Sequence, residues 1–269
     1  MVNQDIYVGD CRQQLGHVRD ASVDLLITDP PYNIGVKYHP DYNDHQHRDR
    51  FLAYLHACLQ ACLPKLKKTG SVVVFMGPEL QGHVQVLLRT LGLHWRNTVI
   101  WHYTFGQAQQ KKFTPSWTAM HYFTRHRTRY VFNAAKIRIP SARQLLYKDK
   151  RANPQGKLPD DLWVLLTEHQ VPDGFTAQMD AWRMSRVCGT FREREGYATQ
   201  LPLPLTERWL TALTNPGDTV LDPFLGTGTT LIAAARLGRH GSGMELSRAV
   251  ARRAHKRLRE AGAHVTLHK

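Results

Sequence analysis

The feature that most constrains the fold is a mostly apolar segment, residues 23–27, that runs into the motif Asp29-Pro-Pro-Tyr32. The apolar run predicts a buried strand. The two prolines end that strand, because proline lacks the N–H group that a sheet requires and restrains the residue before it. An acid, a rigid turn and an aromatic ring therefore meet at the carboxyl end of a strand, where ligands bind in open α/β sheets. An ordinary strand-ending turn is the alternative interpretation.

Strand and helix patterns alternate around this motif. Further strands are expected at 5–9, 71–76, 96–102, 219–222 and 240–244, and helices at 51–66, 79–91, 207–213, 231–237 and 247–260. This alternation predicts a mostly parallel sheet with helices on both faces. The polar segment 33–50 is predicted to be a mobile loop beside the motif, long enough to act as a lid.

Positive charge is concentrated in one part of the 269-residue chain, which has a net charge of +14 and a pI near 9.9. Residues 109–157 contain twelve Lys and Arg but one acid, Asp149, and aromatic residues lie between them. Phosphates attract basic side chains and unstacked bases attract aromatic faces, so this segment predicts a nucleic-acid partner. The candidate contacts are Lys111, Lys112, Arg125, Arg127, Arg129, Lys136, Arg138 and Arg143. The alternative is a solvated basic region whose aromatic residues form a small core.

A second motif, Asp222-Pro-Phe-Leu-Gly-Thr-Gly-Thr-Thr230, predicts a strand, a tight glycine turn and the start of a helix. Glycines let the backbone approach a ligand closely, and the helix offers free N–H groups. Glu245 follows at the end of the next predicted strand, where nucleotide-binding α/β folds place the acid that binds ribose hydroxyls. The Gly-x-Gly-x-x-Gly fingerprint is incomplete, which argues against a dinucleotide and thus against a nicotinamide dehydrogenase.

With both motifs in this order, the chain resembles the amino-group DNA methyltransferases that use S-adenosylmethionine, and in particular their β class, in which the catalytic tetrad precedes the glycine motif. The resemblance implies an α/β, Rossmann-like fold in the circularly permuted order with an inserted target-recognition region. It divides the chain into a catalytic half (1–106), the insertion (107–190) and a cofactor-binding half (191–269).

The resemblance also implies roles for individual residues. Asp29, Pro30, Pro31 and Tyr32 would form the catalytic tetrad, and S-adenosylmethionine would be the cofactor. Its binding residues would be Asp10 at the adenine, Glu245 at the ribose, Gly226, Thr227, Gly228 and Thr229 at the methionine end, and Thr199 and Gln200 at the methionine carboxylate. Asp222 and Phe224 would also bind the cofactor. The segment before Thr199 usually begins His-Pro in this family, whereas it is Tyr197-Ala198 here.

The tetrad suits methylation of an exocyclic amine on a base flipped out of double-stranded DNA. Asp29 and the Pro30 carbonyl would accept hydrogen bonds from the N–H groups of the amine and so expose its lone pair, while Tyr32 stacks on the base. In this family an Asp at the first tetrad position favours adenine N6, with cytosine N4 the alternative. Methylation of cytosine C5 is excluded, because it needs a Pro-Cys nucleophile that the sequence lacks. RNA or protein-amide methylation and an inactive DNA-binding protein are the remaining alternatives.

Composition sets further expectations. No apolar run approaches the roughly 20 residues that span a bilayer, and the N-terminal residues show no signal pattern, so we expect a cytoplasmic, nucleoid-associated protein. A cognate restriction endonuclease and a second copy of the chain are partners compatible with the family. The four cysteines do not form a disulfide framework; Cys58 and Cys62 should be buried, and we expect no metal site. The alternative is a zinc site formed by these two and His39, His45 and His47.

Overall fold

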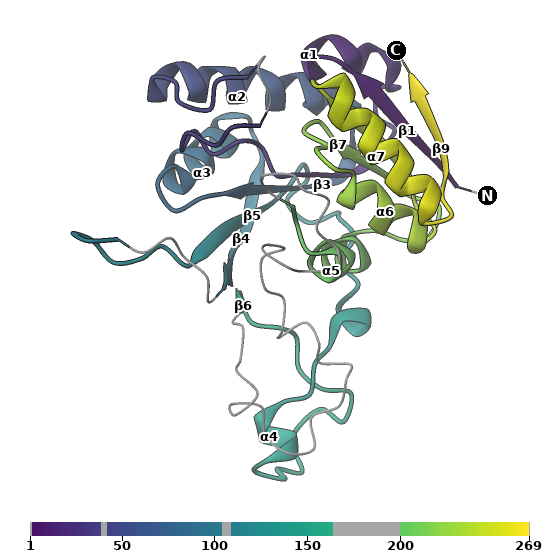
Figure 1. Ribbon diagram of the computed structural model, residues 1–269. Helices are drawn as coiled ribbons and strands as arrows, with labels where there is room; N and C mark the ends of the chain where they lie inside the picture. Colours follow the sequence, from purple (N-terminus) through teal and green to yellow (C-terminus); the bar gives the residue numbers. More distant parts are fainter. Residues whose placement is uncertain (1, 39–41, 104–108, 164–199, 269) are drawn as a thin grey trace.

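The computed structural model describes residues 2–38, 42–103, 109–163 and 200–268. Its centre is a sheet in the order β6-β4-β5-β3-β2-β7-β8-β1-β9 (Figure 1). The strands are β1 (Asn3–Val8), β2 (Val23–Thr28), β3 (Leu66–Met76), β4 (His94–His102), β5 (Trp117–Thr124), β6 (Leu162–Trp163), β7 (Thr219–Asp222), β8 (His240–Glu245) and β9 (His264–His268). Six of the eight neighbouring pairs are parallel, and β5 runs antiparallel to β3 and β4. The predicted mostly parallel α/β sheet is confirmed.

Helices cover both faces of this sheet (Figure 1). The α-helices are α1 (Cys11–Gln14), α2 (Arg48–Cys62), α3 (Gln81–Thr90), α4 (Ala142–Leu145), α5 (Leu203–Leu213), α6 (Thr229–Arg236) and α7 (Arg248–Glu260), and the short 3-10 helices are η1 (Leu15–His17), η2 (Leu63–Lys65) and η3 (Ala134–Ile137). Successive strand residues point to opposite faces, so Leu25 and Ile27 pack against the layer of α5, α6 and α7, whereas Leu26 packs against that of α1, α2 and α3. None of the helices in the described residues has the length and apolar character needed to cross a membrane.

Helix α2 shows how local chemistry sets the boundaries. The predicted helix 51–66 begins three residues earlier, at Arg48, and ends at Cys62. Pro64 explains the earlier end, because its ring would clash with the helix backbone one turn before it, and the chain continues as η2. The buried face of α2 consists of Phe51, Leu55, Cys58, Leu59 and Cys62, so the expectation that both cysteines are buried is confirmed.

Strand β5 departs from the expected organisation. It falls inside the range 107–190 that was expected to be an insertion, yet it lies in the sheet between β3 and β4. Ala119, Met120 and Phe123 are fully buried, because both faces of this strand are covered. The chain leaves the sheet only after Thr124 and passes η3, which packs against α5. It then forms an extension from the domain around α4 (Figure 1). The remainder of the expected insertion, 164–190, lies outside the described residues, as does Thr199.

The two motifs meet in the middle of the sheet. Strand β2, which leads into Asp29, pairs in parallel with β7, which leads into the glycine turn, with Leu25 opposite Val220. Parallel strands end at the same edge, so both motifs lie at the carboxyl edge of the sheet although most of the chain separates them. This is the arrangement that places ligands in open α/β sheets.

Candidate active site

The tetrad leaves the sheet directly after Thr28, the last residue of β2. The Tyr32 hydroxyl donates a hydrogen bond of 2.6 Å to Asp29 Oδ1. Burial raises the pKa of Tyr32 well above its usual value, so this hydroxyl keeps its proton and remains a donor. The Tyr32 ring lies against Gly77, where a Cβ atom would come within 2.9 Å of Tyr32 Cδ2. Strand β3 is therefore followed by a residue without a side chain, which leaves room for the ring.

The loop after the tetrad is held by one buried acid, Asp44, which is 2% exposed. Its carboxylate accepts backbone N–H groups from Asn33 (2.9 Å), Ile34 (3.1 Å) and Val36 (2.9 Å). Asn33 has φ of +60°, which turns these N–H groups inward. The described part of the segment expected to be a mobile lid is thus a structured loop, and Asp44 is a positioning residue that no motif in the sequence indicated.

The glycine turn follows β7 and opens α6. Gly226 and Gly228 have φ of +53° and +85°, a region that side chains disfavour. A Cβ atom on Gly228 would also lie 3.1 Å from Ala254 and Leu258, so α7 packs directly on the turn. The Arg257 guanidinium, from the same helix, donates to the Thr227 carbonyl oxygen and to Thr229 Oγ1, both at 3.1 Å.

Asp222 joins the two motifs. Its carboxylate accepts the hydroxyls of Thr28 and Thr230, both at 2.7 Å, and the Phe224 N–H at 3.1 Å. Burial raises the pKa of Asp222 to about 6, although the three hydrogen-bond donors act in the opposite direction and lower it. Thr28 immediately precedes Asp29, so the hydrogen bond from Thr28 to Asp222 also fixes the position at which the tetrad leaves β2.

Two further acids stand at the ends of β8 and β1. Glu245 accepts the Gly226 N–H at 3.0 Å and the Ser247 N–H at 2.8 Å, and burial raises its pKa to about 7. Asp10 caps α1 and pairs with Arg12 at 2.6 Å, which lowers the pKa of Asp10. The Gly9 N–H donates to the Glu245 carbonyl at 2.9 Å, so these two strand ends are adjacent.

A pocket at this edge joins the tetrad to the second motif. Its walls include Asp29 and Pro31 of the tetrad together with the predicted cofactor residues Asp10, Gln200, Asp222, Phe224, Gly226, Thr227, Thr229 and Glu245. Pro30, Tyr32 and Gly228 lie beside the pocket and do not line it. Sequence reasoning missed three tyrosines in the wall, Tyr38, Tyr42 and Tyr54, which come from the tetrad loop and α2 and belong to no motif.

This set of groups fits S-adenosylmethionine. Buried Glu245 and half-buried Asp10 offer carboxylate oxygens to hydroxyl and amino groups, and the glycine turn offers close backbone approach. Phe224 and the three tyrosines supply apolar and aromatic surface. Asp29 of the tetrad lines the same pocket.

The predicted DNA contacts separate into three places. Lys111 and Lys112 are exposed in the β4–β5 loop, at the same sheet edge as the tetrad. Arg125, Arg127 and Arg129 follow the other end of β5, at the opposite edge. Lys136 and Arg138 lie in and after η3, and Arg143 lies in α4.

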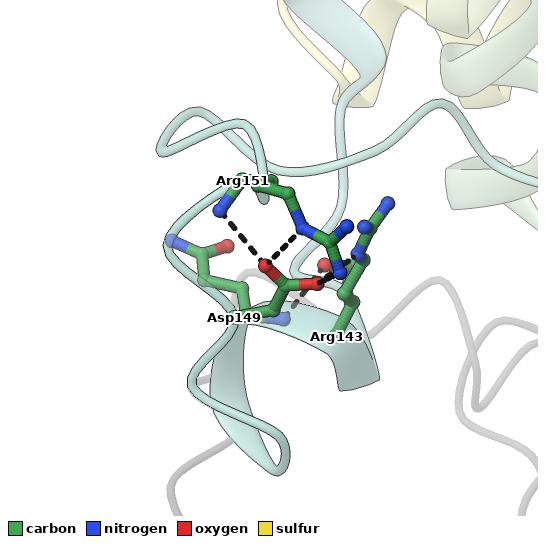
Figure 2. A network of polar contacts seen from close by, with 5 residues as sticks. Arg143, Asp149 and Arg151 are labelled. Atoms are coloured by element: carbon green, nitrogen blue, oxygen red, sulfur yellow. Dashed lines mark hydrogen bonds and ion pairs between the residues drawn. The ribbon is translucent and has the colours of Figure 1, made fainter.

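Several of these arginines already have partners within the chain. Arg125 Nη1 donates to the carbonyl oxygen of Leu63 at 2.7 Å, so it supports the end of η2. Arg143 and Arg151 share the Asp149 carboxylate at 2.6 and 3.1 Å, which lowers the pKa of Asp149 (Figure 2). Two cations on one anion leave this cluster positively charged.

Comparisons with known proteins identify the family. A family model described as DNA methylase matches residues 23–256. The type II methyltransferase M.HpaI of Haemophilus parainfluenzae is 29% identical over 96% of this chain and 74% of its own length. The DNA adenine methyltransferase YhdJ of Escherichia coli K12 is 30% identical over 89% of this chain and 77% of its own. The structure of TTHA0409 from Thermus thermophilus, complexed with S-adenosyl-L-methionine, is 25% identical, with a TM-score of 0.62 over 99% of this chain and all of its own (100%).

These findings confirm the resemblance, the fold and the cofactor predicted above. They also make the chain an enzyme that acts on DNA, and so set aside RNA, protein amides and an inactive scaffold. With the Asp-Pro-Pro-Tyr tetrad before the glycine turn and a pocket between them, the chain belongs to the DNA methylase family whose members transfer a methyl group from S-adenosylmethionine to adenine N6 or cytosine N4.

Proposed function

We propose that the chain methylates adenine N6 at a specific sequence in double-stranded DNA. The observation that carries this proposal is Asp29, which lies in the wall of the cofactor pocket and has Tyr32 as its hydrogen-bond donor. An Asp at this tetrad position favours adenine in the family, and adenine methylation is also the activity named for the YhdJ relative. Cytosine N4 is the second candidate, because the same acceptors serve an amine beside a ring nitrogen in either base.

The proposed mechanism makes the amine nucleophilic by placing acceptors around it. The lone pair of an exocyclic amine is conjugated into the ring, so the amine is a poor nucleophile. The Asp29 carboxylate and the Pro30 carbonyl accept hydrogen bonds from the two N–H groups of the amine. These acceptors draw the nitrogen toward sp³ geometry and stabilise the positive charge that develops on it. Tyr32 stacks on the flipped base and, through its hydroxyl, fixes the orientation of Asp29. S-adenosylmethionine would supply the electrophilic methyl group and leave as S-adenosylhomocysteine, and the methylated nitrogen would lose one proton to Asp29 or to water. Positioning replaces any covalent enzyme intermediate.

The pocket suggests how the cofactor lies. We assign Glu245 to the ribose hydroxyls and Asp10 to the adenine amino group, since their carboxylates stand at the adjacent ends of β8 and β1. Asp222, Phe224 and the turn residues Gly226, Thr227, Gly228 and Thr229 would surround the methionine end. Gln200 lines the same pocket, and Thr199 beside it is assigned to the methionine carboxylate from the sequence alone.

DNA recognition is assigned to the region outside the sheet. We retain the division into a catalytic half, a recognition region within 107–190 and a cofactor half, with β5 reassigned to the catalytic sheet. The preferred DNA contacts are Lys111, Lys112, Lys136, Arg138 and Arg143, because Arg125, Arg127 and Arg129 stand at the far edge of the sheet.

Association with the nucleoid follows from a DNA substrate. A cognate endonuclease and a homodimer fit a palindromic target.

Substitution of Asp29 tests the assignment of the tetrad. Asp29→Asn keeps the size of the side chain but exchanges one acceptor oxygen for a donor, so methyl transfer to DNA should fall by about 10²-fold or more. Binding of S-adenosylmethionine, measured by calorimetry, should change little. Asp20→Asn removes an exposed carboxylate that pairs with Lys65 and does not line the pocket, and serves as the matched control. Full activity in Asp29→Asn would show that the tetrad is wrongly assigned.

A further inference from the structure

Phe113 is the most exposed large apolar side chain in the described residues, at 100%. It stands in the loop between β4 and β5, directly after Lys111 and Lys112. Burial of apolar surface is the main driving force of folding, so a phenylalanine left wholly in water contributes nothing to the core of this domain. An aromatic ring in that position is better explained by a surface that covers it in a complex.

The loop lies at the catalytic edge of the sheet. Strands β4 and β5 pair antiparallel with His102 opposite Trp117, so the loop joins the ends of these strands at one edge. Met76, the last residue of β3, lies opposite Ala119 near the start of β5. Because β3 is parallel to β2, this is the edge at which Asp29 follows β2. The described part of the loop projects away from the sheet as an arm (Figure 1).

The base of this arm also touches the tetrad. The Tyr103 hydroxyl donates to the Trp117 carbonyl oxygen at 3.1 Å and lies 3.4 Å from Thr118 Oγ1. Thr118 in turn hydrogen-bonds to Tyr32. The strand ends that carry Phe113 are therefore fixed against the side chain that is assigned to stack on the flipped base.

The composition of the arm fits a DNA duplex. Residues 109–117 contain two lysines and no acid, so the arm is attracted to phosphates. Apolar side chains that enter a base step, phenylalanine among them, unstack it and can fill the space between bases. A base that leaves the helix opens such a space, and an unfilled space disfavours the flipped state.

We propose that Phe113 enters the duplex at the position vacated by the target base, while Lys111 and Lys112 contact the flanking phosphates. The inference rests on base flipping in the proposed function and adds a residue that acts on the DNA rather than on the amine. In this role Phe113 stabilises the flipped state and leaves the chemical step to the tetrad.

The test compares two duplexes that carry the sequence methylated by the wild-type enzyme, one fully paired and one with a mismatch at the target base. A mismatched base costs less to extrude. Phe113→Ala should lower kcat/KM on the paired duplex by about tenfold or more, and by less than about twofold on the mismatched one. Phe113→Leu keeps an apolar wedge and should stay close to wild type on both. Since the ring is fully exposed, neither change should affect folding.

Controls separate a wedge from general binding. Lys112→Ala should weaken the binding of both duplexes to the same extent and reduce its salt dependence, since the change removes a phosphate contact. Trp95→Ala removes an exposed aromatic ring at the other end of the β4–β5 pair and should leave the ratio between the duplexes unchanged. An equal loss on both duplexes in Phe113→Ala, or none on the paired one, overturns the proposal. Wild-type methylation of the paired duplex, at whichever base it occurs, measures the proposed function separately.

Discussion

The hydrogen bond between Thr28 and Asp222 provides the most direct perturbation of the link between the two motifs. Thr28→Val replaces the hydroxyl by a methyl group of similar size at a fully buried position and removes one of the three donors to the Asp222 carboxylate. A hydrogen bond to a charged group contributes about 1.5–3 kcal/mol. We therefore expect the free energy of unfolding to fall by about that amount, with a decrease in Tm of about 3–12 °C.

The loss of unfolding free energy in Thr28→Val should depend on pH, because the bond that is removed goes to a buried carboxylate. The pKa of Asp222 is raised to about 6 from its ordinary value of 3.8, so its contribution to stability is present below pH 4 and is lost as the pH rises through 6. Loss of the Thr28 hydroxyl should raise the pKa of Asp222 further, because that hydroxyl stabilises the ionised form. The variant should thus be most destabilised near about pH 8, and much less near about pH 5, where the carboxylate is largely protonated in both proteins.

Urea unfolding at both pH values, followed by circular dichroism, measures the effect. Thr28→Ser keeps the hydroxyl and should show no extra loss at the higher pH. In a cycle with Asp222→Asn, the two single changes should not add, since they remove the same bond. A loss below about 0.5 kcal/mol at about pH 8, or an equal loss at both pH values, would refute the reasoning.

Three further predictions concern the pocket and the arginines. Burial raises the pKa of Glu245 to about 7, and ribose hydroxyls would favour its ionised form. Calorimetry should therefore show cofactor binding that tightens as the pH rises from about 6 to about 8, with proton release on binding near about pH 6 that disappears by about pH 8, and Glu245→Gln should abolish this dependence. Arg257→Ala removes the donor to the glycine turn and should weaken cofactor binding about tenfold, whereas Arg253→Ala, exposed on the same helix, should not; equal affinities would contradict the role of Arg257. Arg125→Ala should lower the free energy of unfolding by about 1.5–3 kcal/mol and leave the affinity for duplex DNA unchanged in a filter-binding assay. Weaker DNA binding without loss of stability would instead show that Arg125 contacts DNA.

The parts of the fold that were predictable are those fixed by local backbone chemistry. The two prolines after Thr28 end a strand wherever they occur in a sheet, and the positive φ angles of Gly226 and Gly228 need residues without side chains. Both motifs could therefore be located from the sequence. The family resemblance predicted one binding site for Asp10 and Glu245, and both residues line the same pocket.

The parts that were missed depend on contacts between distant segments. Strand β5 is covered on both faces, so it lacks the alternation that marks an exposed strand, and its basic surroundings suggested a loop. Asp44 became a positioning residue only because the chain folds back to place three N–H groups around it. The hydrogen bond from Arg125 to the Leu63 carbonyl oxygen could not be predicted, because it depends on where the end of β5 lies relative to η2.

We propose that the protein transfers a methyl group to adenine N6 in DNA at the pocket that Asp29 lines. The most direct measurement is nucleoside mass spectrometry of mixed-sequence DNA after incubation with the purified protein and isotopically labelled S-adenosylmethionine. We expect labelled N6-methyladenine with the wild-type protein and none with Asp29→Asn. Labelled N4-methylcytosine would keep the fold and mechanism but contradict the choice of base, and labelled product from Asp29→Asn at the wild-type level would contradict the mechanism itself.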